Sequence, residues 1–339
     1  MQKVSILRRA ARALFGTAVA IVGAFALTLL VTGGVFAQQP ASVNPTASSV
    51  NEQKLLEALG PQGNVGGRVT IPDARSGTLI QPDGRTFRAD RDQSAKIGGL
   101  SILGILGLLV VFYLIRGKVR ISGGRSGETM TRFGFMDRFA HWLTATSFLL
   151  LGFTGLNITF GRSLVLPVIG PDAFTALSQT GKFVHNYVSF AFVLGIVLMF
   201  LMWAKDNFPA LRDIRWFLQG GGLIGLGHPP AGRFNGGQKL IFWSVVLGGA
   251  AIAFTGYILM FPFQWTDVAG MQWASVWHGI LGLVLFAIII AHIYIGSVGM
   301  EGAFEAMGSG EVDVKWAREH HSVWVEKVAA KSGKTAPAE

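Results

Sequence analysis

The stretch WHGILGLVLFAIIIAHIY, residues 277–294, decides the fold, because it is almost wholly apolar and still carries two histidines, His278 and His292. On an α-helix, the fourteen positions from one to the other rise about 21 Å and fall about 40° short of four full turns. The two imidazoles therefore share a helix face but lie most of a bilayer thickness apart. They belong either to two different sites or to none.

The rest of the chain has the same apolar character. Half of its 339 residues are hydrophobic and only 14% are charged. Each charge-free window is long enough to cross a hydrocarbon core, which takes about 20 helical residues, and a helix satisfies its own backbone groups in lipid. The sequence therefore predicts an all-α integral membrane protein. The windows without Asp, Glu, Lys or Arg are residues 13–36, 97–115, 139–161, 183–204, 240–266 and 268–300.

The chain contains no cysteine. This excludes disulfides, thiolate-held iron–sulfur clusters and a covalent C-x-x-C-H haem attachment on this chain. Any redox centre here must use nitrogen or oxygen ligands.

Composition divides the chain into predicted segments. Residues 1–37 begin with basic residues, continue as an apolar run and end in small residues, as in a signal peptide or an N-terminal anchor. The fold predicted is a four-helix transmembrane bundle with one or two extra N-terminal spans. The remaining segments are a flexible extracytoplasmic stretch (38–95), an extra transmembrane helix (96–116), a basic cytoplasmic linker (117–138), the four-helix bundle (139–300) and a basic cytoplasmic tail (301–339).

Basic residues indicate the orientation of the predicted spans. They gather after residue 116, in the loop 205–239 and in the tail, and they are sparse in the loops 162–182 and 264–274. Because Lys and Arg are in excess on the cytoplasmic side of a membrane, the C-terminus is expected in the cytoplasm. The net charge of +10 is then explained by topology and by anionic lipid headgroups, and no nucleic-acid partner is expected.

Four of the seven histidines fall in the last four windows, and the predicted orientation sorts them by depth. His141 begins the first core helix and His292 lies near the end of the fourth, so both lie toward the cytoplasm. His185 begins the second and His278 begins the fourth, so both lie toward the outer face. The helix predicted over residues 268–300 therefore contributes one histidine to each of two stacked pairs.

Two imidazoles per pair favour haem over other metal centres. A tetrahedral zinc site takes three or four protein ligands, and a di-iron bundle needs Glu-x-x-His motifs that the spans lack. Haem supplies four nitrogens itself, so two facing histidines complete six-coordination and make an electron carrier. The alternative is a histidine hydrogen-bonded between helices or a proton relay. His228 in a Pro/Gly-rich loop, and His320 and His321 in the charged tail, are interpreted as solvated or partner-facing.

From about residue 130 to 328 the chain resembles the cytochrome b membrane subunit, or gamma subunit, of respiratory formate dehydrogenase. About 125 residues at the start have no counterpart in the minimal four-helix member. The motifs that carry the resemblance follow one another in order: RFGFMDRFAHW (132–142), KFVHNYV (182–188), DIRWFL (213–218), RFNGGQKLIFW (233–243), the opening stretch and WAREHHSVW (316–324).

The resemblance implies a four-helix bundle with two b haems. It implies that His185 and His278 ligate the haem near the periplasm, and that His141 and His292 ligate the haem near the cytoplasm. These are the same pairs that charge and spacing indicate.

The resemblance also implies a menaquinone or ubiquinone pocket beside the inner haem. The matching residues are Asn235, Gly237 and Gln238, whose amides can hydrogen-bond quinone carbonyls while the glycine lets a flat ring approach. The alternative for this stretch is a flexible turn before a helix.

By resemblance, the chain is expected to be the membrane-anchoring dihaem b cytochrome of a formate dehydrogenase complex in the bacterial inner membrane. A catalytic molybdenum or tungsten subunit would oxidise formate, and an iron–sulfur subunit would pass electrons through the two haems to the quinone pool. The alternatives are the cytochrome b subunit of a nickel–iron hydrogenase or a thiosulfate reductase, and a haem-free membrane anchor or transporter subunit.

Overall fold

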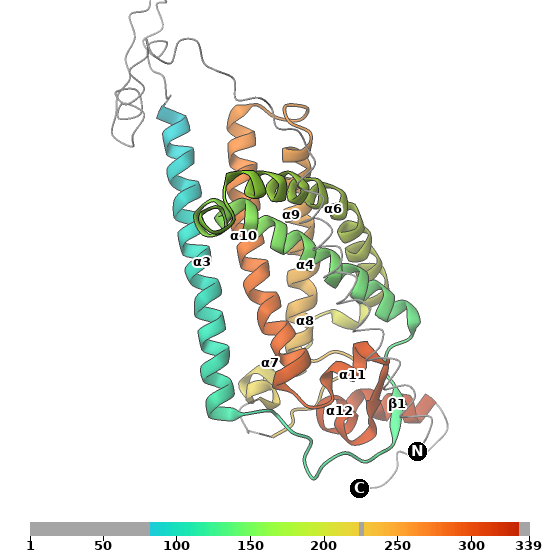
Figure 1. Ribbon diagram of the computed structural model, residues 1–339. Helices are drawn as coiled ribbons and strands as arrows, with labels where there is room; N and C mark the ends of the chain where they lie inside the picture. Colours follow the sequence, from blue (N-terminus) through green and yellow to red (C-terminus); the bar gives the residue numbers. More distant parts are fainter. Residues whose placement is uncertain (1–81, 224–226, 332–339) are drawn as a thin grey trace, which may run out of the picture.

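The computed structural model of the protein describes residues 82–223 and 227–331, and these ranges are almost entirely helical (Figure 1). The predicted N-terminal signal or anchor, its window 13–36 and most of the segment 38–95 lie outside the described residues. The long helices are α3 (Pro82–Arg116), α4 (Phe135–Leu164), α6 (Pro171–Asn207) and α10 (Val268–Tyr294). The shorter elements are β1 (Thr129–Thr131), α5 (Leu166–Ile169), α7 (Leu211–Leu218), η1 (Gly220–Gly222), α8 (Gly236–Trp243), η2 (Ser244–Gly248), α9 (Gly249–Met260), η3 (Ile295–Gly299), α11 (Ala303–Gly308), β2 (Glu311–Asp313) and α12 (Val314–Lys331).

Five helical segments of the described chain are long and apolar enough to cross a membrane. Each coincides with one of the last five charge-free windows, so the prediction of an all-α membrane protein is confirmed. The helices overrun most windows, because a charge-free window marks the lipid-buried part and the helix continues into the polar boundary. The five segments are Gly84–Arg116, Phe135–Leu164, Pro171–Asn207, Gly236–Met260 and Val268–Gly299.

Helix α3 begins at Pro82, so the prediction that residues 82–95 are part of a flexible segment was wrong. Proline is well suited to the first helical position, because its missing N–H would have no partner there. The polar first turns of the helix lack an apolar stripe because they project past the apolar part of the span. No residue in the most apolar part of α3 is buried, as expected for a helix that faces lipid.

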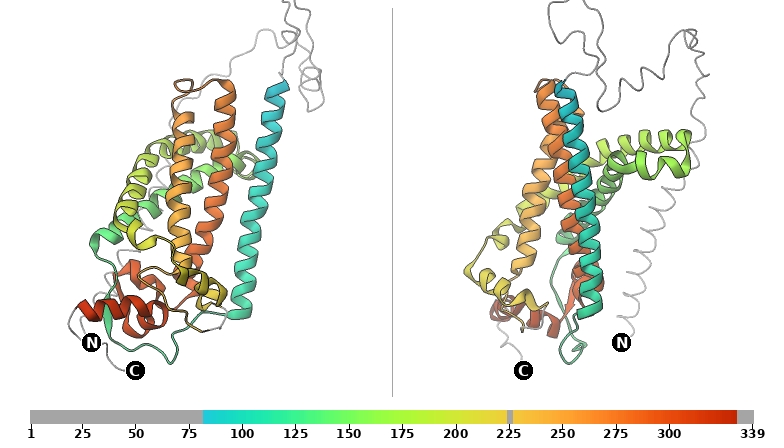
Figure 2. Two further views of the ribbon diagram at one scale, coloured as in Figure 1. Left: turned by 180° about the vertical axis from the view of Figure 1, so that it is seen from behind. Right: turned by 90° about the vertical axis from the view of Figure 1, so that its left-hand side faces the viewer.

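The spans form two sets that cross at a steep angle. Helices α3 and α10 and the α8–α9 span run side by side, whereas α4 and α6 pack on each other and cross this set obliquely (Figure 2). Gly98 allows α3 to lie close to α10, because a Cβ there would come within 2.9 Å of the Leu283 Cβ.

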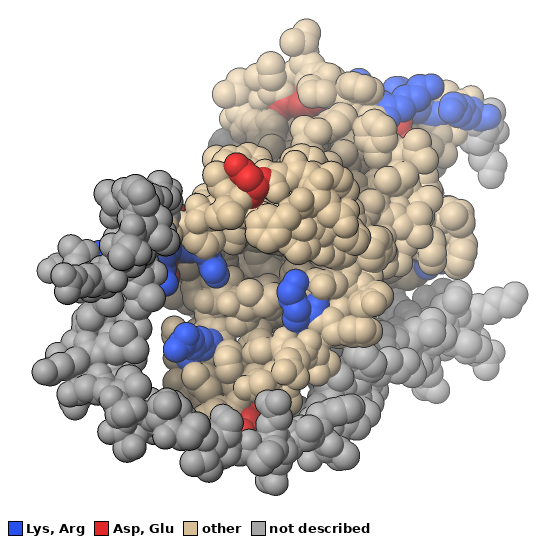
Figure 3. Space-filling model, turned by 90° about the horizontal axis from the view of Figure 1, so that it is seen from above, with Lys and Arg blue, Asp and Glu red and all other residues tan. Residues whose placement is uncertain are grey.

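The connecting segments that were predicted to be cytoplasmic gather at one end of the molecule. Helices α7, α11 and α12 and strand β1 all lie there (Figure 1). We call residues 117–134, 208–223, 227–235 and 300–331 the basic end. Seen from the opposite end, the uncovered surface shows charged side chains scattered among many uncharged ones (Figure 3).

One carboxylate joins α4 and α6 to the basic end. Asp137 in the first turn of α4 accepts hydrogen bonds from Trp203 Nε1 at 2.6 Å and from Arg233 Nη2 at 3.0 Å. Arg233 also pairs with Asp206 at the end of α6, at 2.9 Å. The loop before α8 is thereby fixed against α4 and α6.

The ion pair of Asp213 with Lys239 holds α7 against α8 at 2.8 Å, and the two side chains are only 11% and 10% exposed. The Lys239 ammonium also donates to the Phe208 carbonyl at 3.0 Å. A buried pair of this kind depends on both partners, because removing one leaves an uncompensated charge.

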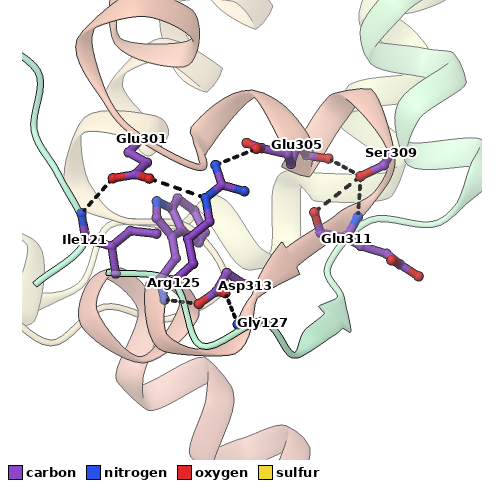
Figure 4. Close-up of polar contacts among 9 residues, drawn as sticks. Ile121, Arg125, Gly127, Glu301, Glu305, Ser309, Glu311 and Asp313 are labelled. Carbon is purple, nitrogen blue, oxygen red and sulfur yellow. Dashed lines mark hydrogen bonds and ion pairs between the residues drawn. The ribbon is translucent and has the colours of Figure 1, made fainter. Parts of the chain in front are cut away.

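The linker after α3 is tied to the tail by a small antiparallel sheet and by ion pairs. Strand β1 pairs with β2, with Met130 opposite Val312. Arg125 donates to Glu301 at 3.3 Å and to Glu305 at 2.8 Å, on either side of the start of α11 (Figure 4). These side chains are about a third exposed, with 36% for Arg125 and 27% and 39% for its partners.

A buried arginine lies at the centre of the basic end. Arg132 is 4% exposed, and its guanidinium lies 5.1 Å from the ring centre of Phe133 and 5.3 Å from those of Trp316 and Trp324. Burial, and then the charge of Arg233, lower the pKa of Arg132 to about 9, so the side chain stays cationic at neutral pH. The aromatic faces stabilise that charge by cation–π attraction.

We expect Asp213→Ala to lower the free energy of unfolding by about 3 kcal/mol, because the Lys239 ammonium would stay buried without its carboxylate. Arg125→Ala is the matched control, since it removes exposed ion pairs worth less than about 1 kcal/mol. Unfolding of the purified protein in detergent, followed by circular dichroism, measures both. Equal losses in the two variants would contradict the different burial of the two ion pairs.

Candidate functional site

The structure brings the outer histidines together from two different helices. His185 lies on α6 and His278 on α10, and their ring centres are 6.1 Å apart with an interplanar angle of 69°. Both rings lie farther from the helix ends than the sequence indicated, because α6 already begins at Pro171 and α10 at Val268. The two histidines of the predicted outer pair therefore lie close together in the structure.

Threonine hydroxyls fix the ring orientation of the outer pair. Thr154 Oγ1 lies 2.8 Å from His185 Nδ1, and its own proton is directed to the Leu150 carbonyl at 2.7 Å. His278 Nδ1 lies 3.0 Å from the Ile252 carbonyl and 3.2 Å from Thr255 Oγ1. A carbonyl can only accept, so His278 Nδ1 carries the proton, and a hydroxyl already donating makes His185 Nδ1 a donor too. Each Nε2 is left with its lone pair free.

The inner histidines also meet. His141 on α4 and His292 on α10 have ring centres 6.2 Å apart and an interplanar angle of 57°. His141 Nδ1 is buried and has no hydrogen-bond partner among the described residues. A single helix, α10, therefore contributes one imidazole to each of two pairs at two depths, as the sequence predicted.

The ring separations fit a metal held between two imidazoles. Metal–nitrogen bonds of about 2.0 Å, with about 1.1 Å from each nitrogen to its ring centre, place the ring centres about 6.2 Å apart. The observed separations of 6.1 and 6.2 Å match this value, and they are too long for a direct hydrogen bond between the rings. Each pair supplies two nitrogen ligands, which suits a macrocycle that brings its own equatorial ligands.

A glycine leaves space for the His278 ring of the outer pair. A Cβ at Gly256 would lie 3.0 Å from His278 Cε1 and 3.4 Å from its Nδ1. Real Cβ atoms rarely come so close, so a larger residue would push the ring out of its position. The position carries no signal in the sequence, because many spans contain glycine.

The predicted quinone residues form the start of helix α8. Asn235 Oδ1 accepts from the Gln238 N–H at 2.9 Å, and Gln238 Oε1 accepts from the Asn235 N–H at 3.1 Å. This reciprocal capping box satisfies two backbone donors. Neither side-chain amide nitrogen donates a hydrogen bond to a described residue. Gly237 packs on Trp216, since a Cβ there would lie 2.9 Å from the indole ring.

The tail histidines differ from the prediction. His320 is 8% exposed and His321 is fully buried, so the interpretation of these two side chains as solvated or partner-facing was wrong. His321 Nδ1 donates to the Gly232 carbonyl at 2.8 Å and so ties α12 to the loop before α8. Burial, and then the charges of His228 and Arg132, lower the pKa of His320 to about 4. His228 remains partly exposed, at 31%.

A family model described as prokaryotic cytochrome b561 matches residues 132–310, which is more than half of the chain and includes both histidine pairs. The chain belongs to the prokaryotic cytochrome b561 family. It is therefore an all-α integral membrane cytochrome b, and haem b is the cofactor of this family. Helix α3 lies outside the part of this cytochrome b that the family model matches.

This cytochrome b is also similar to named bacterial proteins. The cytochrome b556(Fdn) subunit of nitrate-inducible formate dehydrogenase from Escherichia coli (strain K12) is 28% identical over 212 residues, which cover 60% of this chain and 95% of the relative. The formate dehydrogenase cytochrome b556(fdo) subunit of the same strain is 25% identical over 215 residues, covering 62% and 98%. The formate dehydrogenase cytochrome b556 subunit of Haemophilus influenzae is 27% identical over 195 residues, covering 55% and 78%.

We expect Gly256→Val to weaken haem binding at the outer pair by about tenfold, because it displaces His278 from its position facing His185. Gly107→Val is the control, since a Cβ at this exposed position of α3 meets nothing within 4 Å. Haem extracted per mole of purified chain measures both variants. Unchanged haem content in the Gly256 variant would contradict the requirement for close packing at this ring.

Proposed function

We propose that this chain is the membrane-anchoring, electron-carrying subunit of a formate dehydrogenase complex, holding two b haems and reducing quinone. The observation that carries the proposal is the pair of facing histidines at each of two depths, with ring centres 6.1 and 6.2 Å apart. The proposed ligands are His185 and His278 for the outer haem, and His141 and His292 for the inner haem.

Each haem, when bound, supplies a one-electron iron(III)/iron(II) couple. The two imidazoles of each pair would hold the haem iron from both sides, which suits electron transfer rather than the binding of a small ligand. The Thr154 and Thr255 hydroxyls fix the ring orientation and the tautomer, as partners beyond the metal ligands commonly do.

Helix α10 sets the distance between the two levels. Its histidines are fourteen residues apart, which corresponds to about 21 Å of helix rise. Electron transfer between haems at these two levels would move charge across much of the hydrocarbon core, which is about 30 Å thick. The chain is thus long enough to link a donor on one side to an acceptor near the other.

The proposed orientation puts the basic end, and with it the C-terminus, in the cytoplasm. Its segments carry the excess of Lys and Arg that marks the cytoplasmic side. The outer pair then faces the periplasm, where an iron–sulfur subunit would deliver electrons from a molybdenum or tungsten subunit that oxidises formate. The named relatives are all formate dehydrogenase subunits, which favours formate over hydrogen or thiosulfate as the electron source.

The proposed quinone site lies at the start of α8, on the cytoplasmic side. Asn235 and Gln238 use their side-chain oxygens in the capping box, so their amide nitrogens remain available to donate to a quinone carbonyl. Gly237 and Trp216 supply a flat apolar surface beside them. Menaquinone and ubiquinone both present carbonyls of the required kind.

A reduced-minus-oxidised spectrum with haem counting tests the haem proposal. We expect two b haems per chain, and about half of that content in His278→Ala or His292→Ala, because each removes a ligand of one haem only. The spectra of the two variants should differ, since each retains the haem that the other loses. A single haem in the wild-type chain, or the complete loss of haem in both well-folded variants, would contradict two separable sites.

The electron source is tested separately. We expect affinity purification of the chain from membranes to bring down an iron–sulfur subunit and a molybdenum or tungsten subunit. Added formate should then reduce the b-type absorbance under anaerobic conditions. Reduction by hydrogen but not by formate would favour the hydrogenase alternative instead.

The quinone site is tested by a conservative change. Gln238→Glu keeps the oxygen that accepts from the Asn235 N–H and removes only the amide donor, so the helix start stays intact and its dipole favours the added charge. We expect about a tenfold loss in kcat/KM for quinone reduction, as for one lost hydrogen bond. Haem content is the control, and unchanged quinone kinetics would remove Gln238 from the site.

A further inference from the structure

A cluster of metal-ligating side chains lies in the basic end, away from both histidine pairs. It consists of His228 in the loop before α8 and of Glu319 and His320 on α12. One ligand atom from each lies within 4.8 Å of the other two. His228 Nε2 is 3.8 Å from Glu319 Oε2, and the two imidazole ring centres are 5.2 Å apart.

Three segments far apart in the sequence hold the cluster in place. The Ser122 N–H, in the linker after α3, donates to Glu319 Oε1 at 2.9 Å. The bond from His321 to the Gly232 carbonyl holds the loop with His228 against α12. The backbone of α12 is distorted at His321, where φ is −146° and ψ is 43°.

One oxygen of the cluster has no partner that satisfies it. Glu319 Oε2 is buried and has no hydrogen-bond partner among the described residues. His228 Nε2 lies 3.8 Å from it, which is beyond hydrogen-bonding distance. A buried carboxylate oxygen without a partner costs free energy, and a cation bound to it would remove that cost.

The cluster matches one class of ligand. Two imidazoles and one carboxylate are a usual set for zinc, with a fourth position left for water. Calcium and magnesium prefer all-oxygen sites, and the softest metals prefer thiolates, which the chain lacks. Ligand atoms of a tetrahedral zinc site lie about 3.4 Å apart, so the cluster needs only a small contraction to close on an ion.

We propose that His228, Glu319 and His320 bind a divalent transition-metal ion, with zinc the best match, and that the ion clamps the loop 227–235 to α12. The site is separate from the haem ligands and does not depend on the proposed function. Its place in the fold assigns it a structural role, because it joins the loop that leads into α8 to the tail.

The test uses the full chain in detergent, purified without a polyhistidine tag and treated with a chelator. After incubation with Zn²⁺ and gel filtration, we expect one zinc per wild-type chain by elemental analysis. His228→Ala and Glu319→Gln should each weaken zinc binding by at least about tenfold, as the loss of a ligand does. Glu326→Gln, an exposed carboxylate on the same helix, is the matched control and should keep the zinc.

Haem absorbance of each variant is measured alongside, because it reports on folding independently of zinc. Chelator-treated wild-type protein that takes up no zinc would overturn the proposal without reference to any variant. Zinc retained in both ligand variants would also overturn it, since the ion would then lie elsewhere. Loss of zinc with haem content unchanged supports the proposal and leaves the haem assignment untouched.

Discussion

The structure depends on holding two pairs of imidazoles opposite each other within the membrane, where an unsatisfied polar group is expensive. Helix α10 contributes to both pairs, because His278 lies opposite His185 of α6 and His292 lies opposite His141 of α4. The α4–α6 pair crosses α10 obliquely (Figure 2), so that α4 approaches α10 at His292 and α6 approaches it at His278.

Several residues of the motifs that carry the resemblance make structural contacts in or next to the basic end. Asp137 and Arg233 join α4, α6 and the loop before α8, and Asp213 with Lys239 joins α7 to α8. Arg132 lies among aromatic rings at the centre of the same region. These interactions fix where α4 and α8 begin, and therefore the depth and rotation at which His141 is presented. Charged residues close to the membrane boundary thus determine geometry within it.

The spans and the two pairs could be predicted from sequence because both rest on signals averaged over many residues. Charge-free windows mark the helices, and the facing pairs follow from where the histidines fall within them. Burial of His320 and His321 could not be predicted, because it comes from contacts with loops distant in sequence, such as the Gly232 carbonyl. Thr154 and Thr255 were missed for a related reason. A threonine in an apolar helix commonly bonds the carbonyl four residues earlier, so its type gives no sign of a second partner.

Helix α3 packs along α10, with Gly98 set against Leu283 and Gly99 facing Phe160 of α4. This flank of the helix that carries His278 and His292 is therefore already covered by α3. A neighbouring protein therefore cannot contact this flank of α10 directly. Any protein that associates on this side would contact the exposed face of α3 instead.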